Sequence, residues 1–131
     1  MTDAPVTPRP MILCIEDEPV IRSVIARVLR RAGYAVVEAA DGAQGLRAIR
    51  ASRPDLVLCD VGLPVIDGLR VLDAVRAGEA GDPGLPFVML SALAEPGDAA
   101  EAMRRGADAY VGKPVDLDGL LAVLAERLSR R

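Results

Sequence analysis

The chain has 131 residues, 51% of them hydrophobic, and a formal net charge of -3 at pH 7. A chain of this length forms one domain with a hydrophobic core, and its mixed charges leave no basic stripe for direct nucleic-acid binding. No apolar stretch approaches the roughly 20 residues of a membrane span, so no membrane segment is expected. Histidine is absent, which excludes His-based zinc sites and Ser-His-Asp or Cys-His catalysis.

The N-terminal segment carries three prolines and no periodicity, which predicts a flexible tail over 1–10 and a single domain over 11–129. Because this segment also lacks the apolar stretch of a signal peptide, we expect a cytoplasmic protein. Cys14 and Cys59 each fall inside an apolar strand. Two reduced thiols that pack as small hydrophobes are expected there rather than a disulfide.

Residues 11–15 predict the first strand, and Glu16, Asp17 and Glu18 follow it directly. These acids suit the N-terminal end of a helix dipole. From Pro19, hydrophobic residues recur at helical spacing until Gly33, which predicts an amphipathic helix.

A short second strand is predicted at 35–37, and Asp41 begins the helix after it. The apolar run 55–60 lies between two prolines that are too close together for a helix of about 10–12 residues. We therefore predict a buried central strand that presents Asp60 at its carboxyl end.

Three helices and two strands complete the predicted elements. Leu69, Leu72 and Val75 mark a helix after the central strand. A fourth strand at 87–90 ends at Ser91, and a fifth at 109–111 stops before Lys113. The helix between them, from Pro96 to Arg105, has few large apolar residues and is expected to be the most loosely packed. Leucines line a closing helix over 117–128.

Strict alternation of strands and helices predicts an α/β fold with a doubly wound, five-stranded parallel sheet and helices on both faces. The flavodoxin-like order 2-1-3-4-5 places the first and third strands side by side at the centre. Because the carboxyl ends of parallel strands lie at one edge of the sheet, the polar residues that follow them are expected to converge there.

The residues at these strand ends form a candidate site, and they are Glu16, Asp17, Asp60, Ser91 and Lys113. Neighbouring carboxylates repel one another unless a cation lies among them. Magnesium suits this set because it takes oxygen ligands and often uses one or two carboxylates with a phosphate. Asp60 could then attack a phosphoryl donor, with Ser91 donating to a phosphoryl oxygen and Lys113 neutralising charge.

Each residue also has a simpler interpretation. Glu16 and Asp17 could only charge the start of a helix, Ser91 could be a cap, and Lys113 could be a solvated surface lysine. A carboxylate on a buried strand such as Asp60 is harder to explain, because an unpaired buried charge is costly. The joint pattern favours a site.

In these segments the chain resembles the receiver domain of response regulators, the phosphoacceptor module of two-component signalling. The similarity extends from about Met11 to Leu128 and is carried by residues 12–18, 55–69, 89–92 and 106–110, with Lys113-Pro114. It implies that Asp60 accepts a phosphoryl group from a histidine kinase or a histidine phosphotransfer protein. It also implies that Asp17, Asp60 and the Gly62 carbonyl bind magnesium, and that Glu16 assists through water.

The resemblance further implies that Ser91 and Tyr110 form a switch and that the Lys113-Pro114 bond is cis. The switch would act on a downstream protein partner through the fourth helix, the fifth strand and the fifth helix. Glu16 stands where the family more often has Asp, and Ser91 where Thr is commoner.

Two other functions have different sequence requirements. An aspartate-nucleophile phosphatase needs a second acid two residues after its nucleophile, where this chain has Gly62. A receiver-like scaffold that binds partners without phosphorylation would lack an acid or the lysine, and none is missing. We therefore do not expect an enzyme beyond self-catalysed phosphorylation and slow dephosphorylation. A free-standing receiver and a piece of a longer protein both remain open.

Overall fold

The structure is a computed structural model that describes residues 9–92 and 96–130. The tail predicted over 1–10 lies outside the described residues, apart from residues 9 and 10. The strands are β1 (Met11–Ile15), β2 (Ala35–Ala39), β3 (Leu56–Asp60), β4 (Phe87–Ser91) and β5 (Ala109–Gly112). The helices are α1 (Pro19–Arg31), α2 (Gly42–Ser52), α3 (Gly68–Arg76), α4 (Pro96–Arg104) and α5 (Leu117–Ser129).

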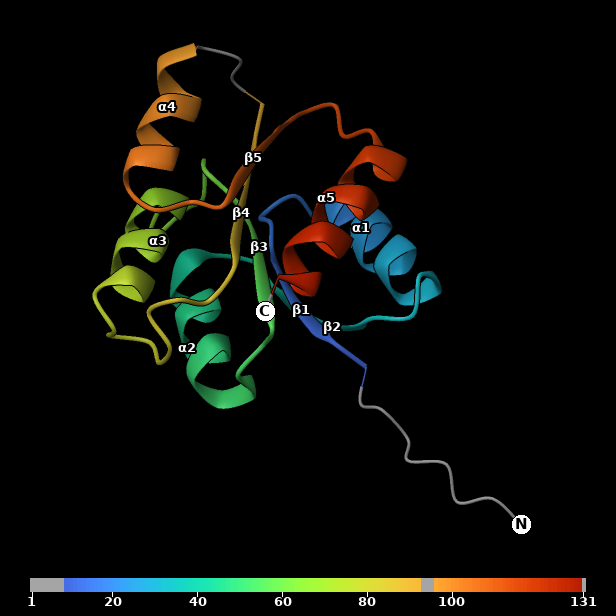
Figure 1. Ribbon diagram of the computed structural model, residues 1–131, viewed down its shortest axis with the longest axis horizontal. Helices are drawn as coiled ribbons and strands as arrows, with labels where there is room; N and C mark the ends of the chain where they lie inside the picture. Colours follow the sequence, from blue (N-terminus) through green and yellow to red (C-terminus); the bar gives the residue numbers. More distant parts are fainter. Residues whose placement is uncertain (1–8, 93–95, 131) are drawn as a thin grey trace.

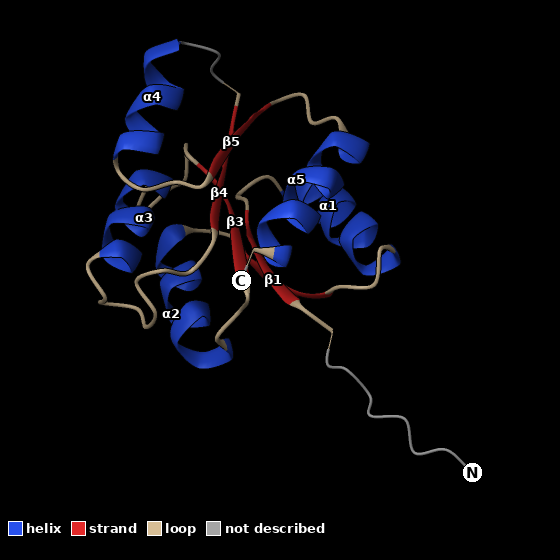
Figure 2. Ribbon diagram, viewed as in Figure 1, coloured by secondary structure: helices blue, strands red, loops and turns tan. Residues whose placement is uncertain are grey.

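A parallel sheet of five strands in the order β2-β1-β3-β4-β5 forms the centre of the molecule (Figure 1). Figure 2 shows that α1 and α5 cover one face of this sheet and that α2, α3 and α4 cover the other. Each face has its own cluster of buried side chains. The predicted doubly wound α/β fold and its strand order are confirmed.

The central strand β3 and its neighbour β4 are covered on both faces over their whole length. All residues of β3 and β4 are buried, which explains why their sequences are continuous apolar runs without polar alternation. Phe87 and Leu58 are fully buried, and burial of a large apolar side chain contributes about 1.5–3 kcal/mol. Cys14 and Cys59 are buried free thiols, as predicted.

The helix after β1 begins and ends where the sequence predicts. The N-cap of α1 is Glu18, whose side chain accepts from the Val20 N–H at 3.3 Å, and Pro19 occupies the first turn. Ile25 and Leu29 face the core. Gly33 has φ +102°, a backbone conformation that favours glycine and turns the chain toward β2.

Several predicted boundaries differ from the structure by one or two residues. The second strand was predicted to end at residue 37 but extends to Ala39, because β1 continues to pair with it as far as Ile15. The fifth strand continues one residue further, to Gly112, which pairs with Ser91. The fourth helix ends at Arg104, one residue earlier than predicted.

None of the described helices has the length and apolar composition needed to cross a bilayer.

Candidate functional site

The predicted acids come together at the carboxyl ends of β1 and β3. These strands are adjacent and pair Ile15 with Cys59, so Glu16 and Asp60 occupy neighbouring positions just beyond that pair. Glu16, Asp17 and Asp60 each offer a carboxylate oxygen, and these oxygens lie within 4.8 Å of one another. Glu16 and Asp60 are buried, whereas Asp17 is exposed. The cluster therefore opens to solvent on the Asp17 side.

Lys113 brings a positive charge into this cluster from the chain after β5. Its Nζ lies 2.5 Å from Oε1 of Glu16 and 3.3 Å from Oδ2 of Asp60. The backbone of the lysine is held in place, because the backbone N–H of Lys113 donates to the Ser91 carbonyl oxygen at 2.7 Å. The Lys113-Pro114 bond is cis, as the resemblance implied.

The pKa values of both partners are raised. Burial raises the pKa of the Glu16 carboxyl, and the hydrogen bond from Lys113 offsets this only in part. Burial alone would lower the pKa of Lys113, but the hydrogen bond to Glu16 and the charge of Asp60 raise it above its ordinary value. Three carboxylates and one ammonium lie together here, so the negative charge of the cluster exceeds its positive charge. The same imbalance would favour a bound cation.

The resemblance implies that Glu16 assists magnesium binding through water, and in the structure its buried carboxylate accepts a hydrogen bond from Lys113. Side chains alternate between the two faces of a strand, and Glu16 continues the row of Ile12 and Cys14 just beyond β1. The burial of Glu16 could therefore have been predicted by continuing the alternation of the strand one residue beyond Ile15. The Glu18 N–H donates to Oε2 of Glu16 at 3.2 Å, so both carboxylate oxygens are hydrogen bonded.

The remaining predicted residues lie around this cluster. Ser91 is buried at the end of β4, next to the end of β3. Gly62 lies two residues beyond Asp60, in a loop that returns to the strand end through Gly68, whose N–H donates to the Val61 carbonyl at 2.9 Å. A Cβ at position 68 would lie 2.2 Å from the Asp60 carbonyl oxygen, so this close approach requires glycine.

Tyr110 lies outside the acidic cluster. It is a half-buried residue of β5 that pairs with Met89 of β4 and packs against the hydrophobic cluster beneath α2, α3 and α4. Ser91 lies two residues beyond Met89, at the site itself. Tyr110 therefore lies on β5, which is the strand that pairs with β4, and β4 ends at Ser91.

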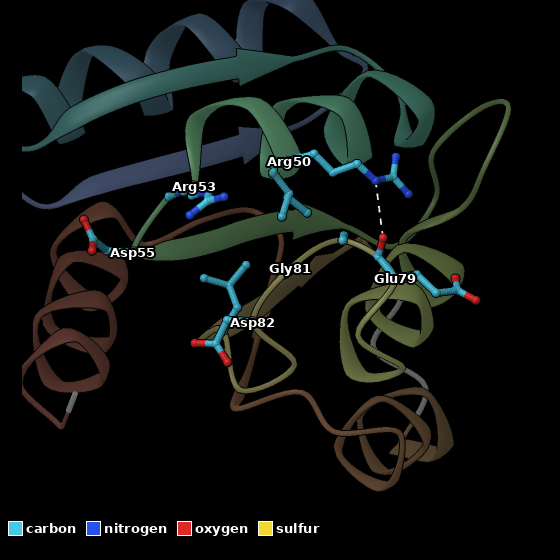
Figure 3. Close-up of a pocket in the computed structure, with 10 residues that line it drawn as sticks. Arg50, Arg53, Asp55, Glu79, Gly81 and Asp82 are labelled. Atoms are coloured by element: carbon cyan, nitrogen blue, oxygen red, sulfur yellow. Dashed lines mark hydrogen bonds between the residues drawn. The ribbon is translucent and has the colours of Figure 1, made fainter.

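The open cavity drawn in Figure 3 lies near the amino ends of β3 and β4, whereas the acidic cluster lies at the carboxyl ends of the strands. The cavity has a volume of about 600 Å³. Its walls are the end of α2 and the loop before β4, and Nε of Arg50 bridges them by donating to the Glu79 carbonyl at 3.3 Å. None of the predicted site residues lines it. The cavity is therefore separate from the acidic cluster.

The family model of the response regulator receiver domain matches residues 12–125. The chain belongs to the response regulator receiver family. The DNA-binding response regulator MtrA of Mycolicibacterium smegmatis is 40% identical over 124 residues, which are 95% of this chain and 53% of that protein. The transcriptional regulatory protein CseB of Streptomyces avermitilis is 40% identical over 119 residues, which are 91% of this chain and 49% of that protein.

Solved receiver domains share the same architecture. The receiver domain of NtrX from Brucella abortus superposes with a TM-score of 0.84 at 34% identity, covering 92% of this chain and 99% of that one. The receiver domain of a sensor histidine kinase from Pseudomonas aeruginosa superposes with a TM-score of 0.83 at 36% identity, covering 92% and 98%. That structure has a magnesium ion coordinated in its active-site cleft.

The receiver chain spans about half the length of the curated relatives that it matches. The relatives are regulators in two-component signalling, and the chain corresponds to their receiver portion. Receiver domains are signalling modules and not typical enzymes.

Proposed function

We propose that Asp60 is the phosphoacceptor of this receiver domain. The observation that carries the proposal is the position of Asp60 at the carboxyl end of β3, with Lys113 at 3.3 Å and two further acids beside it. A carboxylate can act as a nucleophile toward a phosphoryl group when surrounding charges neutralise the donor. Among the acids that the structure describes, Asp60 is the one that is itself the last residue of a strand and has such neighbours.

The acids fit a magnesium ion. Magnesium prefers oxygen ligands, and this cluster offers carboxylate oxygens within 4.8 Å of one another and too little positive charge to balance them. Asp17, Asp60 and the Gly62 carbonyl would hold the ion, and Glu16 would assist through water. The bound ion would neutralise charge on the phosphoryl oxygens.

The chain's own residues would carry out the transfer. A carboxylate oxygen of Asp60 attacks the phosphorus of a phosphohistidine, an O–P bond forms and the P–N bond breaks. The imidazole leaves with the bonding electrons and takes up a proton from solvent. Lys113 and Ser91 would hold the phosphoryl oxygens, and the domain would hydrolyse its own aspartyl phosphate slowly.

The donor would be a histidine kinase or a histidine phosphotransfer protein. The signal would pass through Ser91 and Tyr110 to the surface of α4, β5 and α5, where a protein partner binds. We expect the domain, over residues 11–129, to bind no nucleic acid itself and to act in the cytoplasm. We expect it to catalyse no reaction beyond its own phosphorylation and slow dephosphorylation.

The two alternatives have less support. A phosphatase of this topology would need an acid at position 62, which is glycine. A scaffold that works without phosphorylation is not favoured, because the three acids and Lys113 are all present and adjacent.

The test is phosphorylation by acetyl phosphate in the presence of magnesium, followed by intact mass. One phosphoryl group should add to the wild-type protein and none to Asp60→Asn. Asp67→Asn is the matched control, because Asp67 lies near the same strand end but only caps α3. Labelling of Asp60→Asn would exclude Asp60 as the acceptor.

A further inference from the structure

Arg22 reaches from α1 back to the end of β1, where the acids begin. Its Nη1 donates to the Glu16 carbonyl oxygen at 2.8 Å. Its Nε lies 3.5 Å from Oε1 of Glu38, which belongs to the edge strand β2. The Arg22 side chain is only 21% exposed. The arginine therefore links the acidic loop, the helix and the edge strand.

The position of Arg22 on its helix is unfavourable by itself. It is the fourth residue of α1, and no acid lies in the first turn of this helix. A cation there meets the positive end of the helix dipole, which costs about 0.3–1 kcal/mol at an exposed site. Contacts with Glu16 and Glu38 offset this cost. The interactions beyond the helix, and not the helix itself, explain an arginine at this position.

The bond to the Glu16 carbonyl also sets the direction of Asp17. That oxygen belongs to the peptide unit that joins the two residues, and a peptide unit is planar, so holding the oxygen fixes the position of the Asp17 Cα. The Glu16 N–H is held as well, because it donates to the Ala39 carbonyl at 3.0 Å. The Asp17 side chain makes no hydrogen bond or ion pair with any residue that the structure describes. Its placement among the acids therefore depends on the backbone that Arg22 holds.

We propose that Arg22 is a positioning residue for the acidic site. By binding the Glu16 carbonyl it sets where Asp17 presents its carboxylate to a divalent cation, and Glu38 holds Arg22 in turn. The proposal rests on the proposed function, in which these acids bind magnesium. Removing partners that orient metal ligands typically weakens metal binding about 10–100-fold. Because Arg22 acts through one backbone oxygen, we expect the lower end of this range.

The test compares Arg22→Met with Arg30→Met. Arg30 lies on the same helix and its Nη2 is 3.2 Å from the same Glu38, but it is 50% exposed and contacts the strand at Val36 instead of Glu16. Both variants lose one positive charge. Magnesium affinity is measured by calorimetry or by NMR titration of backbone amides, and thermal melts report whether each variant is folded.

Arg22→Met should bind magnesium about tenfold more weakly than wild type, and Arg30→Met should bind it as wild type does. The rate of phosphorylation by acetyl phosphate should recover to within about twofold at saturating magnesium, because the loss is in binding. Arg22→Lys keeps the charge but not the fork that reaches both acceptors, so it should bind magnesium with intermediate affinity.

Equal magnesium affinity in Arg22→Met and Arg30→Met would overturn the proposal. A rate that stays low at saturating magnesium would overturn it too, because that result indicates a general loss of structure. If Arg22→Met does not fold, the test uses Arg22→Lys and Glu38→Gln instead. Wild-type magnesium affinity in both of these variants would reject the positioning role of Arg22. Failure of the wild-type protein to bind magnesium would instead reject the proposed function on which this inference rests.

Discussion

The ammonium of Lys113 lies 2.5 Å from the buried carboxylate of Glu16, closer than its 3.3 Å distance from Asp60. Lys113 is also the only lysine among the 16 basic residues of the chain. An ammonium is a compact charge that fits between two carboxylates, whereas the guanidinium of arginine is planar and wider. Arginine would therefore not be a conservative replacement here.

We expect Lys113→Met to lower the free energy of unfolding at pH 7 by about 2 kcal/mol, because Glu16 loses a charged hydrogen-bond donor in a buried setting. Urea denaturation measures the loss. The loss from Lys113→Met should be smaller in a Glu16→Gln background, since the buried carboxylate is then absent. Strictly additive effects in this double-mutant cycle would show that the two side chains do not interact.

The raised pKa of Lys113 predicts a loss of stability in alkali. A lysine with a higher pKa in the folded than in the unfolded chain stabilises the fold fully below the unfolded value of about 10.4. This contribution disappears as the pH rises through the folded value. The fall in stability above about pH 10.4 should thus be steeper for wild type than for Lys113→Met.

Because Lys113 is the only lysine, methylation of its amine with a carbon-13 label gives one side-chain NMR signal, apart from that of the N-terminus. Methylation keeps the charge, so the signal reports the pKa directly. The pKa should lie above its ordinary value in the wild type and fall in Glu16→Gln. A titration unaffected by Glu16→Gln would mean that Glu16 does not raise this pKa.

Magnesium should stabilise the folded domain through Asp17. A ligand at 100 times its dissociation constant raises the free energy of unfolding by about 2.7 kcal/mol when it binds only the folded state. Thermal melts at increasing magnesium concentrations should therefore shift upward for wild type and shift little for Asp17→Ala. Glu18→Ala is the control, since Glu18 is also an exposed acid but caps α1 outside the cluster. An equal shift in Asp17→Ala would remove Asp17 from the metal site.

Tyr110 is expected to transmit phosphorylation to α4. In Tyr110→Ala the domain should still accept a phosphoryl group, but the phosphorylation-dependent change in hydrogen exchange over α4 and β5 should shrink. Ala102 is the buried side chain among residues 97–104, and segments with few buried contacts shift at low cost. Tyr34→Ala is a matched control, because Tyr34 is also half buried but packs in the cluster beneath α1 and α5. Equal exchange responses in the two variants would leave Tyr110 with a packing role only.

Local patterns in the sequence determined most of the fold. The apolar runs that end at Ile15, Asp60 and Ser91 predicted strands, because a buried parallel strand needs no polar alternation. The spacing of Ile25 and Leu29 predicted the buried face of α1, because a helix repeats every 3.6 residues. Because crossovers between parallel strands are right-handed, few strand orders are possible for such a sheet. The order with β1 beside β3 brings the acids together.

Only the tertiary structure decided how the site residues meet. Glu16 and Lys113 are 97 residues apart, and their hydrogen bond depends on how closely the ends of β1 and β5 approach. The link from Arg22 to the Glu16 carbonyl cannot be found from residue types, because any arginine can donate to any backbone oxygen. The last residues of β2 form a strand because β1 pairs with them, and their own sequence does not require it. Such features depend on distances between segments, which local propensity and periodicity do not encode.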